Sequence, residues 1–266
     1  MIKLIATDMD GTLLTTDKRM PEDILSVVRA LKAQGTAFVI ASGRQHATLR
    51  RDLADLLGDV LFIAENGAVI AEDDRQLHID PLPEHAIEGI LLAAKDLCGV
   101  HAVVCRAGCA LVSADAPADF IKSVKMYYES TQVVPDLIAA SRGLTDVCKV
   151  AFCSMGNAAT HALPPLERAL GDRLAVILSG QDWVDIMKKG VDKGSAMRIL
   201  QRMRGVSPEE CMAFGDYLND YELLESVSES YAMENALPEL KRIAKHIAPS
   251  NDEDGVMRVI KARFNL

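Results

Sequence analysis

The sequence predicts a doubly wound α/β fold with a parallel, Rossmann-like sheet, interrupted in the middle by a separate α+β unit. Near both ends of the chain, short apolar runs alternate with helical patterns, which is typical of parallel strands joined by helices. Between residues 83 and 183 this alternation gives way to a mixture of helices and hairpin-like strands. We therefore expect two core segments, 1–82 and 184–266, around an inserted domain at 83–183.

The first strand is the apolar run from Ile2 to Thr7, and acidic residues follow it at once. Such a short run suits a buried strand. Side chains two residues apart point to the same face of an extended chain, so Asp8 and Asp10 should project together from its carboxyl end. Neighbouring carboxylates repel unless a cation lies between them, one is protonated or both reach solvent. Gly11 then permits a sharp turn, and Thr12 offers a hydroxyl and an amide nearby.

Two other interpretations of this motif stay open at this point. The Asp10-Gly11 pair alone is compatible with a tight turn after an edge strand. A calcium-binding loop fits less well, because it needs further oxygen ligands at fixed offsets. Leu13 and Leu14 stand where such ligands would be expected.

The second strand, Thr36–Ile40, leads into a small polar segment that contains Ser42 and Gly43. Ligands of such sheets bind outside the carboxyl ends of the strands, so Ser42 should lie on the same edge as Asp8. Ser42 also suits the N-cap of the helix that follows. Both roles are compatible, because the amino terminus of a helix is an anion-binding site.

The inserted unit begins after Pro81-Leu82-Pro83, where two prolines stiffen the chain and indicate a linker. Five of the six cysteines lie in this middle segment. They form no Cys-x-x-Cys pair and have no matching histidine spacing. We therefore favour reduced, mostly buried thiols over a zinc site.

The alternation of strands and helices returns at residue 190, where Lys193 opens a helix. A positive charge at the positive end of a helix is unfavourable by about 0.3–1 kcal/mol at an exposed site. A resident anion would explain this lysine, and a solvated lysine is the alternative.

Ser230–Met233 is expected to be the last strand. Before it, the strand Cys211–Phe214 runs directly into a further polar group, Asp216, Asn219 and Asp220.

Four signals at strand ends therefore occur in order along the chain: Asp8 with Asp10, Ser42 with Gly43, Lys193, and Asp216 with Asn219 and Asp220. Together they resemble the four motifs of the haloacid dehalogenase (HAD) superfamily. The long stretch between the second and third motifs resembles its Cof-type phosphatases, in which a type II cap domain is inserted there. The segments Glu65–Ala68, Ala232–Ala236 and Ser250–Val256 also resemble patterns of that subfamily. Tyr217 departs from the family pattern, in which this residue is more often smaller or polar. The resemblance therefore does not predict the shape of the rim of the site.

The resemblance implies a phosphatase that works through an aspartyl-phosphate intermediate. In it Asp8 would be the nucleophile and Asp10 the general acid and base. Mg²⁺ would be held by the carboxylates of Asp8 and Asp216 and by the backbone carbonyl of Asp10, with Asp220 behind them. The groups that would bind the phosphoryl oxygens are Ser42, Gly43, Lys193 and Asn219.

The composition narrows the possible partners. The chain is 49% hydrophobic and 25% charged, as soluble globular proteins are, and its net charge of −9 argues against a nucleic-acid binder. It has no apolar run that could span a membrane and no signal peptide, so we expect a cytoplasmic protein that does not bind membranes. We expect a monomer or weak homo-oligomer that hydrolyses small phosphorylated metabolites, with sugar phosphates foremost. A phosphosugar mutase and a non-catalytic phosphometabolite sensor are the alternatives.

Overall fold

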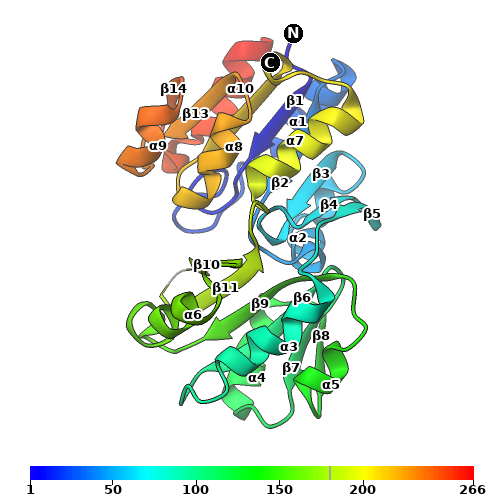
Figure 1. The fold of residues 1–266 in the computed structure, drawn as a ribbon. Coiled ribbons are helices and arrows are strands. Elements are labelled where there is room, and N and C mark those ends of the chain that lie inside the picture. The colour runs from blue at the N-terminus through cyan, green and yellow to red at the C-terminus, as the bar shows by residue number, and fades with distance from the viewer. Residues whose placement is uncertain (180) are drawn as a thin grey trace. The chain divides into compact units, whose positions relative to one another are not determined.

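The computed structural model describes residues 1–179 and 181–266, and its chain divides into two compact units (Figure 1). The first, which we call the core unit, consists of Met1–Gly43, Asp52–His78 and Asp192–Leu266. The second, which we call the inserted unit, consists of Arg44–Arg51 and Ile79–Val191. The domain boundaries near residues 82 and 183 stay a prediction.

The core unit is built on an eight-stranded sheet in the order β14-β13-β12-β1-β2-β3-β4-β5. Neighbouring strands are parallel from β14 to β3, and β3 and β4 are antiparallel. The strands are β1 (Leu4–Thr7), β2 (Ala37–Ala41), β3 (Val60–Ala64), β4 (Val69–Glu72), β5 (Arg75–Ile79), β12 (Cys211–Gly215), β13 (Glu229–Met233) and β14 (His246–Ala248). Every residue of β1, β3 and β12 is buried, as expected for parallel strands covered on both faces.

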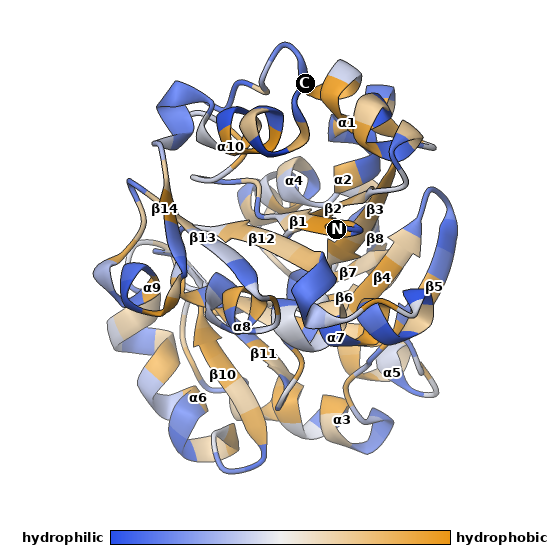
Figure 2. Cartoon of the chain, turned by 90° about the horizontal axis from the view of Figure 1, so that it is seen from above, coloured by the Kyte–Doolittle hydropathy of each residue, from blue (hydrophilic) through white to orange (hydrophobic). Residues whose placement is uncertain are grey.

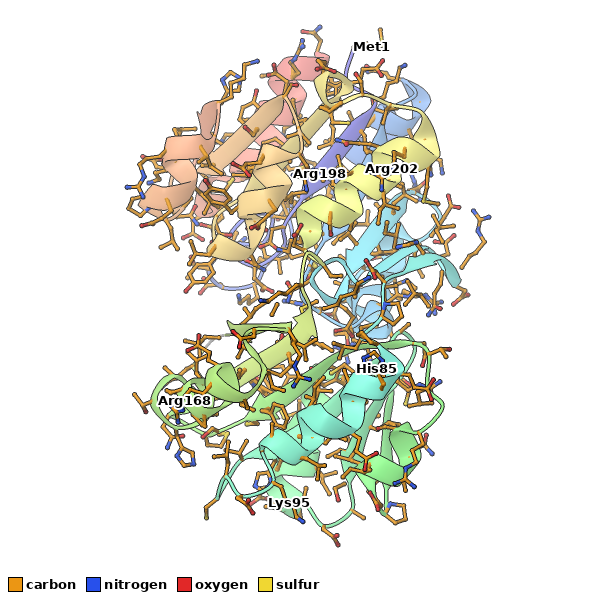
Figure 3. The ribbon with its side chains drawn as sticks, in the orientation of Figure 1. Met1, His85, Lys95, Arg168, Arg198 and Arg202 are labelled. Atoms are coloured by element: carbon orange, nitrogen blue, oxygen red, sulfur yellow. The ribbon has the colours of Figure 1, made fainter. Side chains whose placement is uncertain are left out.

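Helices cover both faces of this sheet. In Figure 2, α1 and α10 lie on one side of the sheet and α7, α8 and α9 on the other. Their bounds are α1 (Ile24–Ala33), α7 (Lys193–Arg204), α8 (Tyr221–Glu225), α9 (Pro238–Ile243) and α10 (Gly255–Phe264). On α7 the buried residues include Ala196 and Leu200, whereas Arg198 and Arg202 are exposed (Figure 3). This amphipathic spacing directs one face of the helix to the sheet.

The inserted unit has a six-stranded sheet in the order β10-β11-β9-β6-β7-β8. Its neighbouring strands are antiparallel except for the parallel pair β7 and β8. The strands are β6 (His101–Arg106), β7 (Ala110–Ser113), β8 (Thr131–Val134), β9 (Val147–Cys153), β10 (Leu174–Leu178) and β11 (Trp183–Lys188). The helices are α2 (His46–Asp52), α3 (Glu84–Ala93), α4 (Ala118–Tyr127), α5 (Leu137–Ser141) and α6 (Leu163–Leu170).

Two apolar clusters cover opposite faces of this second sheet. One joins α3 and α6 to inward residues such as Val104 and Phe152. The other joins Phe120 of α4 to Val103 and Ala151. Because neighbouring residues of a strand point to opposite faces, the members of β6 and β9 divide cleanly between the two clusters.

The prediction that Ser230–Met233 is the last strand is wrong. After β13 the chain forms β14 (His246–Ala248), which pairs with it in parallel at the sheet edge. This strand has three residues, and Ile247 at its centre is 52% exposed. Such a short, solvated edge strand lacks the buried apolar pattern from which strands are predicted.

Candidate active site

The predicted site residues follow three neighbouring strands of the core sheet. Because β12, β1 and β2 lie side by side in parallel, their carboxyl ends meet at one edge. Asp216 follows β12, Asp8 follows β1 and Ser42 follows β2. Such an edge is where α/β sheets of this type bind their ligands.

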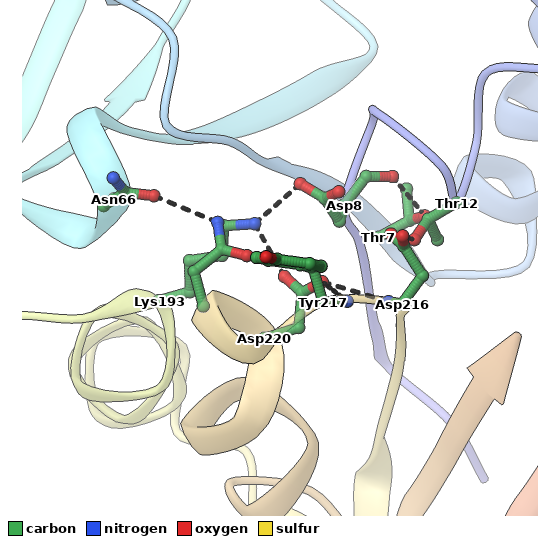
Figure 4. A network of polar contacts seen from close by, with 9 residues as sticks. Thr7, Asp8, Thr12, Asn66, Lys193, Asp216, Tyr217 and Asp220 are labelled. Carbon is green, nitrogen blue, oxygen red and sulfur yellow. Dashed lines mark hydrogen bonds and ion pairs between the residues drawn. The ribbon is translucent and has the colours of Figure 1, made fainter. Parts of the chain in front are cut away.

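Lys193 lies at the centre of the polar network at this edge (Figure 4). Its Nζ donates to Asp8 Oδ1 and to Asp220 Oδ1, each at 2.6 Å, and its side chain is fully buried. As the first residue of α7, it is held by a capping box between Asp192 and Ser195. The alternative of a solvated lysine is therefore wrong. The anions beside it are carboxylates of the chain itself.

Three carboxylates gather around this lysine. One ligand atom each of Asp8, Asp216 and Asp220 lies within 4.8 Å of the others. Burial, with the charge of Asp220 second, raises the pKa of Asp8 to about 8, although Lys193 opposes the shift. Burial likewise raises the pKa of Asp216 to about 6, against the hydrogen bond from Thr12. Burial alone would lower the pKa of Lys193, but Asp220 and Asp8 raise it above its usual value.

This donor set fits a hard divalent cation. Carboxylate oxygens are the ligands that Mg²⁺ takes, and the three carboxyl groups outnumber the single ammonium group of Lys193. Asp220 is the least suited of the three to ligate directly. Its Oδ1 accepts from Lys193, and its Oδ2 accepts from the backbone amides of Asp216 and Tyr217 at 3.1 and 3.3 Å. These contacts agree with a supporting position for Asp220.

Gly11 makes the close approach of two loops possible. It has a φ of +81°, and a Cβ at this position would lie 2.4 Å from Asp216 Oδ2. Any side chain here would therefore displace the Asp216 carboxylate. Next to it, the hydroxyl of Thr12 donates to Asp216 Oδ1 at 2.7 Å. The turn after Asp10 thus orients Asp216.

Asp10 has a different immediate partner from Asp8. Lys18 Nζ donates to Asp10 Oδ1 at 2.9 Å, and the Asp10 side chain is 42% exposed. The extended-chain argument that paired Asp8 with Asp10 does not hold as stated, because β1 ends at Thr7 and a turn begins at Met9. The charge of Asp10 still helps to raise the pKa of Asp216, but less than burial and the charge of Asp220 do. The structure therefore places Asp10 at the solvent side of the cluster.

Ser42, Gly43 and Asn219 are brought together through Asn66. The backbone amide of Asn66 donates to the carbonyl oxygen of Ser42 at 3.1 Å, and Asn219 Nδ2 donates to Asn66 Oδ1 at 3.3 Å. A Cβ at Gly43 would lie 2.9 Å from that same Asn66 Oδ1. Ser42 itself is buried, and it is not the N-cap of α2, because that helix begins at His46.

Asn66 was not among the predicted site residues. It lies in the segment Glu65–Ala68 and has a φ of 53°, in the left-handed region. That conformation directs its amide and side chain toward the Ser42 loop and Asn219. A signal did exist in the sequence, because this segment resembled a pattern of the Cof-type phosphatases.

The other two segments with such patterns support the loop after Asp10. Asn235 Nδ2 donates to the carbonyl oxygen of Gly11 at 2.7 Å, and Asn251 Nδ2 donates to that of Leu14 at 2.9 Å. Asp252 accepts from the amide and the hydroxyl of Thr16 at 2.7 and 2.8 Å. These side chains satisfy backbone groups of an irregular loop, which keeps that loop in one conformation.

Comparison with known proteins defines the family. A model of the haloacid dehalogenase-like hydrolases matches residues 5–260. The chain is 31% identical to the 5-amino-6-(5-phospho-D-ribitylamino)uracil phosphatase YbjI of Escherichia coli K12, over 97% of this chain and 95% of the relative. It is 29% identical to the HMP-PP phosphatase of Klebsiella pneumoniae strain 342, over 95% and 91%. The chain belongs to the haloacid dehalogenase-like hydrolase family.

Solved structures agree with this assignment. A protein from Eubacterium rectale superposes with a TM-score of 0.89 at 28% identity, over 98% of this chain and 99% of the other. A haloacid dehalogenase-like hydrolase from B. subtilis has a TM-score of 0.79 at 22% identity, over 98% and 99%, and supports the fold alone. The predicted α/β fold with an inserted unit is confirmed. The chain is an enzyme, a HAD-type phosphatase that hydrolyses phosphoric monoesters.

No helix in the described part of the chain combines the length and the apolar character needed to cross a membrane.

Proposed function

We propose that this chain is a magnesium-dependent phosphatase of small phosphorylated metabolites and that it works through an aspartyl-phosphate on Asp8. The observation that carries the proposal is the buried cluster of Asp8, Asp216 and Asp220 around Lys193, at the sheet edge where ligands bind. A purely structural network would balance its charges, whereas this one holds an excess of negative charge.

The chemistry is a double displacement. In the first step an oxygen of Asp8 forms a bond to phosphorus, and the bond between phosphorus and the leaving oxygen breaks. Asp10 gives its proton to that leaving oxygen. In the second step water attacks the same phosphorus, Asp10 takes a proton from the water, and the bond to Asp8 breaks. The exposed position of Asp10 suits exchange of protons with the leaving group and with water.

Mg²⁺ would be held by the carboxylates of Asp8 and Asp216 and by the backbone carbonyl of Asp10, with Asp220 in support. When bound, it would neutralise negative charge that develops on the phosphoryl group. Lys193 supplies a fixed positive charge beside the attacking oxygen, because its Nζ lies 2.6 Å from Asp8 Oδ1. The remaining groups proposed to bind the phosphoryl oxygens are Ser42, Gly43 and Asn219.

The substrate class is supported by the relatives and by the kinds of groups at the predicted phosphoryl site. The two named relatives are a 5-amino-6-(5-phospho-D-ribitylamino)uracil phosphatase and an HMP-PP phosphatase, so both act on small phosphorylated compounds. The groups at the sheet edge can recognise a phosphoryl group but not the rest of a metabolite. We place that discrimination in the inserted unit. A cytoplasmic location and a monomeric or weakly oligomeric state stay predictions.

Hydrolysis of p-nitrophenyl phosphate, with Mg²⁺ and after its removal by a chelator, tests the proposed activity. We expect turnover that needs Mg²⁺ and is absent from Asp8→Asn. A panel of phosphorylated metabolites then ranks the substrates. Binding without turnover of any phosphate ester would indicate a sensor instead. Transfer of the phosphoryl group to a second sugar position, dependent on a sugar bisphosphate, would indicate a mutase.

A further inference from the structure

A tight turn over Glu65–Gly67 follows strand β3 directly and has an unusual backbone. Three consecutive residues have a positive φ: Glu65 at 50°, Asn66 at 53° and Gly67 at 106°. Glycine adopts such values readily and asparagine more readily than most residues, whereas they are uncommon for glutamate. Residues held in rarely populated backbone conformations gather at functional sites, where the surrounding structure keeps them in place. The turn is therefore a candidate functional element.

The backbone of this turn holds Ser42. The amide of Ser42 donates to the carbonyl oxygen of Ile63 at 2.8 Å, and the carbonyl oxygen of Ser42 accepts from the amide of Asn66 at 3.1 Å. These bonds continue the pairing of β2 and β3 by one residue beyond the end of β2. Because the amide of Ser42 is used within the sheet, its hydroxyl and the Gly43 amide are the groups of this loop that we propose for phosphoryl oxygens.

The side chain of Asn66 lies between Gly43 and Asn219. Its Oδ1 accepts from Asn219 Nδ2 at 3.3 Å (Figure 4), and a Cβ at Gly43 would lie 2.9 Å from the same oxygen. A side chain at position 43 would therefore displace the Asn66 amide. An asparagine Nδ2 carries two N–H groups, and Asn66 accepts from one of them. The second N–H of Asn219 is the one that can face a phosphoryl oxygen.

Gly67 brings the same turn against the start of α7. A Cβ at this glycine would lie 2.1 Å from the carbonyl oxygen of Asp192 and 3.0 Å from the backbone nitrogen of Lys193. Position 67 therefore accepts no side chain unless the start of α7 moves. Through Asn66 and Gly67 the turn contacts three segments that carry predicted site residues, and all of these segments belong to the core unit.

We propose that Asn66 is a positioning residue for phosphoryl binding, because it fixes the orientation of the Asn219 amide and holds that amide beside the loop of Ser42 and Gly43. This inference rests on the proposed phosphatase function. Rotation of an amide side chain by 180° exchanges its donating nitrogen for its accepting oxygen. Phosphoryl oxygens accept hydrogen bonds, so only one of the two orientations binds them. Asn66 Oδ1 selects that orientation, because it accepts from the nitrogen and would repel the oxygen of a rotated Asn219.

The advantage of this arrangement is preorganisation. Donors that are fixed before the substrate binds stabilise the charge of the transition state without having to reorganise at the moment of reaction. If Asn219 rotated freely, its side chain would have to be ordered on binding, at a cost in conformational entropy. The turn sets the orientation in the folded chain instead, and its left-handed backbone places the Asn66 side chain where it can do so.

Asn66→Gly isolates the side chain of Asn66. Glycine accepts the left-handed backbone and keeps the amide that donates to Ser42, so the turn should still form without the contact to Asn219. We expect kcat/KM for p-nitrophenyl phosphate to fall roughly 2- to 12-fold, the range for one hydrogen bond. In Asn219→Ala it should fall about 10²- to 10³-fold, as for the loss of one donor to transition-state charge.

The double variant decides whether Asn66 acts through Asn219. If it does, Asn66→Gly combined with Asn219→Ala should be as active as Asn219→Ala alone, because the group to be positioned is already absent. A further fall of roughly 2- to 12-fold in the double variant would mean that the two residues act independently, and it would overturn the inference. An unchanged kcat/KM in Asn66→Gly would overturn it as well.

Asn265→Gly is the matched control. Asn265 has a φ of 55° and is exposed at the C-cap of α10, so this variant makes the same substitution in the same backbone conformation. It should leave kcat/KM unchanged.

Binding of inorganic phosphate separates this inference from the proposed function, because it needs no turnover. Calorimetry with Mg²⁺ present should show the same pattern in Kd: weaker binding in Asn66→Gly, still weaker binding in Asn219→Ala, and no further change in the double variant. A merely structural role of Asn66 would lower the fraction of protein that binds phosphate and leave Kd unchanged, which would contradict positioning.

The two proposals can then fail separately. If the wild type hydrolysed no phosphate ester and the pattern in Kd still appeared, the proposed function would fail and the positioning role would stand. If hydrolysis occurred and the two substitutions acted independently, the positioning role would fail and the phosphatase would stand. A wild type that neither bound phosphate nor hydrolysed an ester would overturn both.

Discussion

Both units of the chain bury a lysine next to carboxylates, but the two lysines differ in charge balance. In the core unit Lys193 donates to Asp8 and Asp220 at 2.6 Å each, and Asp216 lies in the same cluster. In the inserted unit Lys149 of β9 donates to Asp185 of the neighbouring strand β11 at 3.1 Å. The first cluster holds more negative than positive charge, and the second pair joins one charge of each sign.

The difference separates a reactive site from a structural contact. A buried ion pair between a lysine and a carboxylate of two neighbouring strands fixes their register at the cost of desolvating two charges. Burial first, and the neighbouring charge of Asp220 second, make the ionised state of Asp8 unfavourable, so its pKa rises to about 8. A cation or a reacting phosphoryl group relieves that repulsion. The unbalanced cluster is therefore the one we expect to carry chemistry.

The largest effect should come from Asp8→Asn, which removes the proposed nucleophile while keeping its shape. We expect the rate of p-nitrophenyl phosphate hydrolysis to fall by about 10⁴-fold or more, as for other enzymes that lose a nucleophile. Asp185→Asn, the same change at the balanced pair, should retain turnover at temperatures where it is folded. Equal losses of activity in two folded variants would contradict the distinction between the two clusters.

Asp10→Asn should have a smaller and kinetically distinct effect. The nitrophenolate leaving group hardly needs a proton, so the first step should survive. Water attacking the aspartyl-phosphate still needs a base, and loss of general base catalysis is typically worth about 10²- to 10⁴-fold. Rapid mixing should then show a burst of nitrophenol close to the enzyme concentration, followed by slow release.

Mass spectrometry of the stalled Asp10→Asn enzyme should find phosphate on the peptide that contains Asp8. The matched control is Lys18→Met, which removes one partner of Asp10 and leaves its carboxylate in place. It should turn over without a burst. Slow release with no burst in Asp10→Asn would show that Asp10 acts mainly in the first step.

The fold and most of the site could be predicted because they follow from local patterns. Buried apolar strands ending in polar residues placed Asp8, Ser42 and Asp216 at adjacent strand ends, and their order in the sheet brings them together. The remaining contacts could not be predicted, because they depend on backbone conformation or join residues that lie far apart in the sequence. Asn66 acts through a left-handed backbone conformation, and Lys149 contacts Asp185, which lies 36 positions further along the chain. The segment Glu65–Ala68 resembles a family pattern, but that pattern does not show which groups Asn66 contacts, and the pairing of Lys149 with Asp185 has neither a period nor a motif in the sequence.

The buried pair of Lys149 and Asp185 should contribute more to the free energy of unfolding than an exposed ion pair does. Asp185→Asn removes the carboxylate that accepts from Lys149, and breaking this buried ion pair should cost about 3–5 kcal/mol in the free energy of unfolding. Asp80→Asn, at an exposed pair with Lys188, should cost about 0–1 kcal/mol. Urea unfolding of both variants measures the two costs. Equal small costs would show that solvent reaches the Lys149 pair.

A further expected effect is a change of stability with pH in protein freed of divalent cations. The pKa of Asp8 is about 8 and that of Asp216 about 6 in the folded chain, against 3.8 for an ordinary aspartate. Between those values the folded state holds protons that the unfolded state has released, so stability must fall as pH rises. The contribution is fully present below about pH 4 and is lost through pH 6 and then pH 8.

In the presence of a chelator, the urea concentration at the midpoint of unfolding should therefore decrease as the pH rises from 5 to 8.5. In Asp8→Asn, the decrease between pH 6 and 8 should be absent. Added Mg²⁺ should reverse the trend, because a cation favours the ionised carboxylates and competes with protons. At a concentration 100 times its Kd it adds about 2.7 kcal/mol at pH 8, and less at pH 5. Asp216→Asn should lose most of this gain, whereas Asp80→Asn should keep it. If Mg²⁺ stabilised the protein independently of pH and of Asp216, the cation would bind elsewhere. The carboxylates around Lys193 would then not be the Mg²⁺ site.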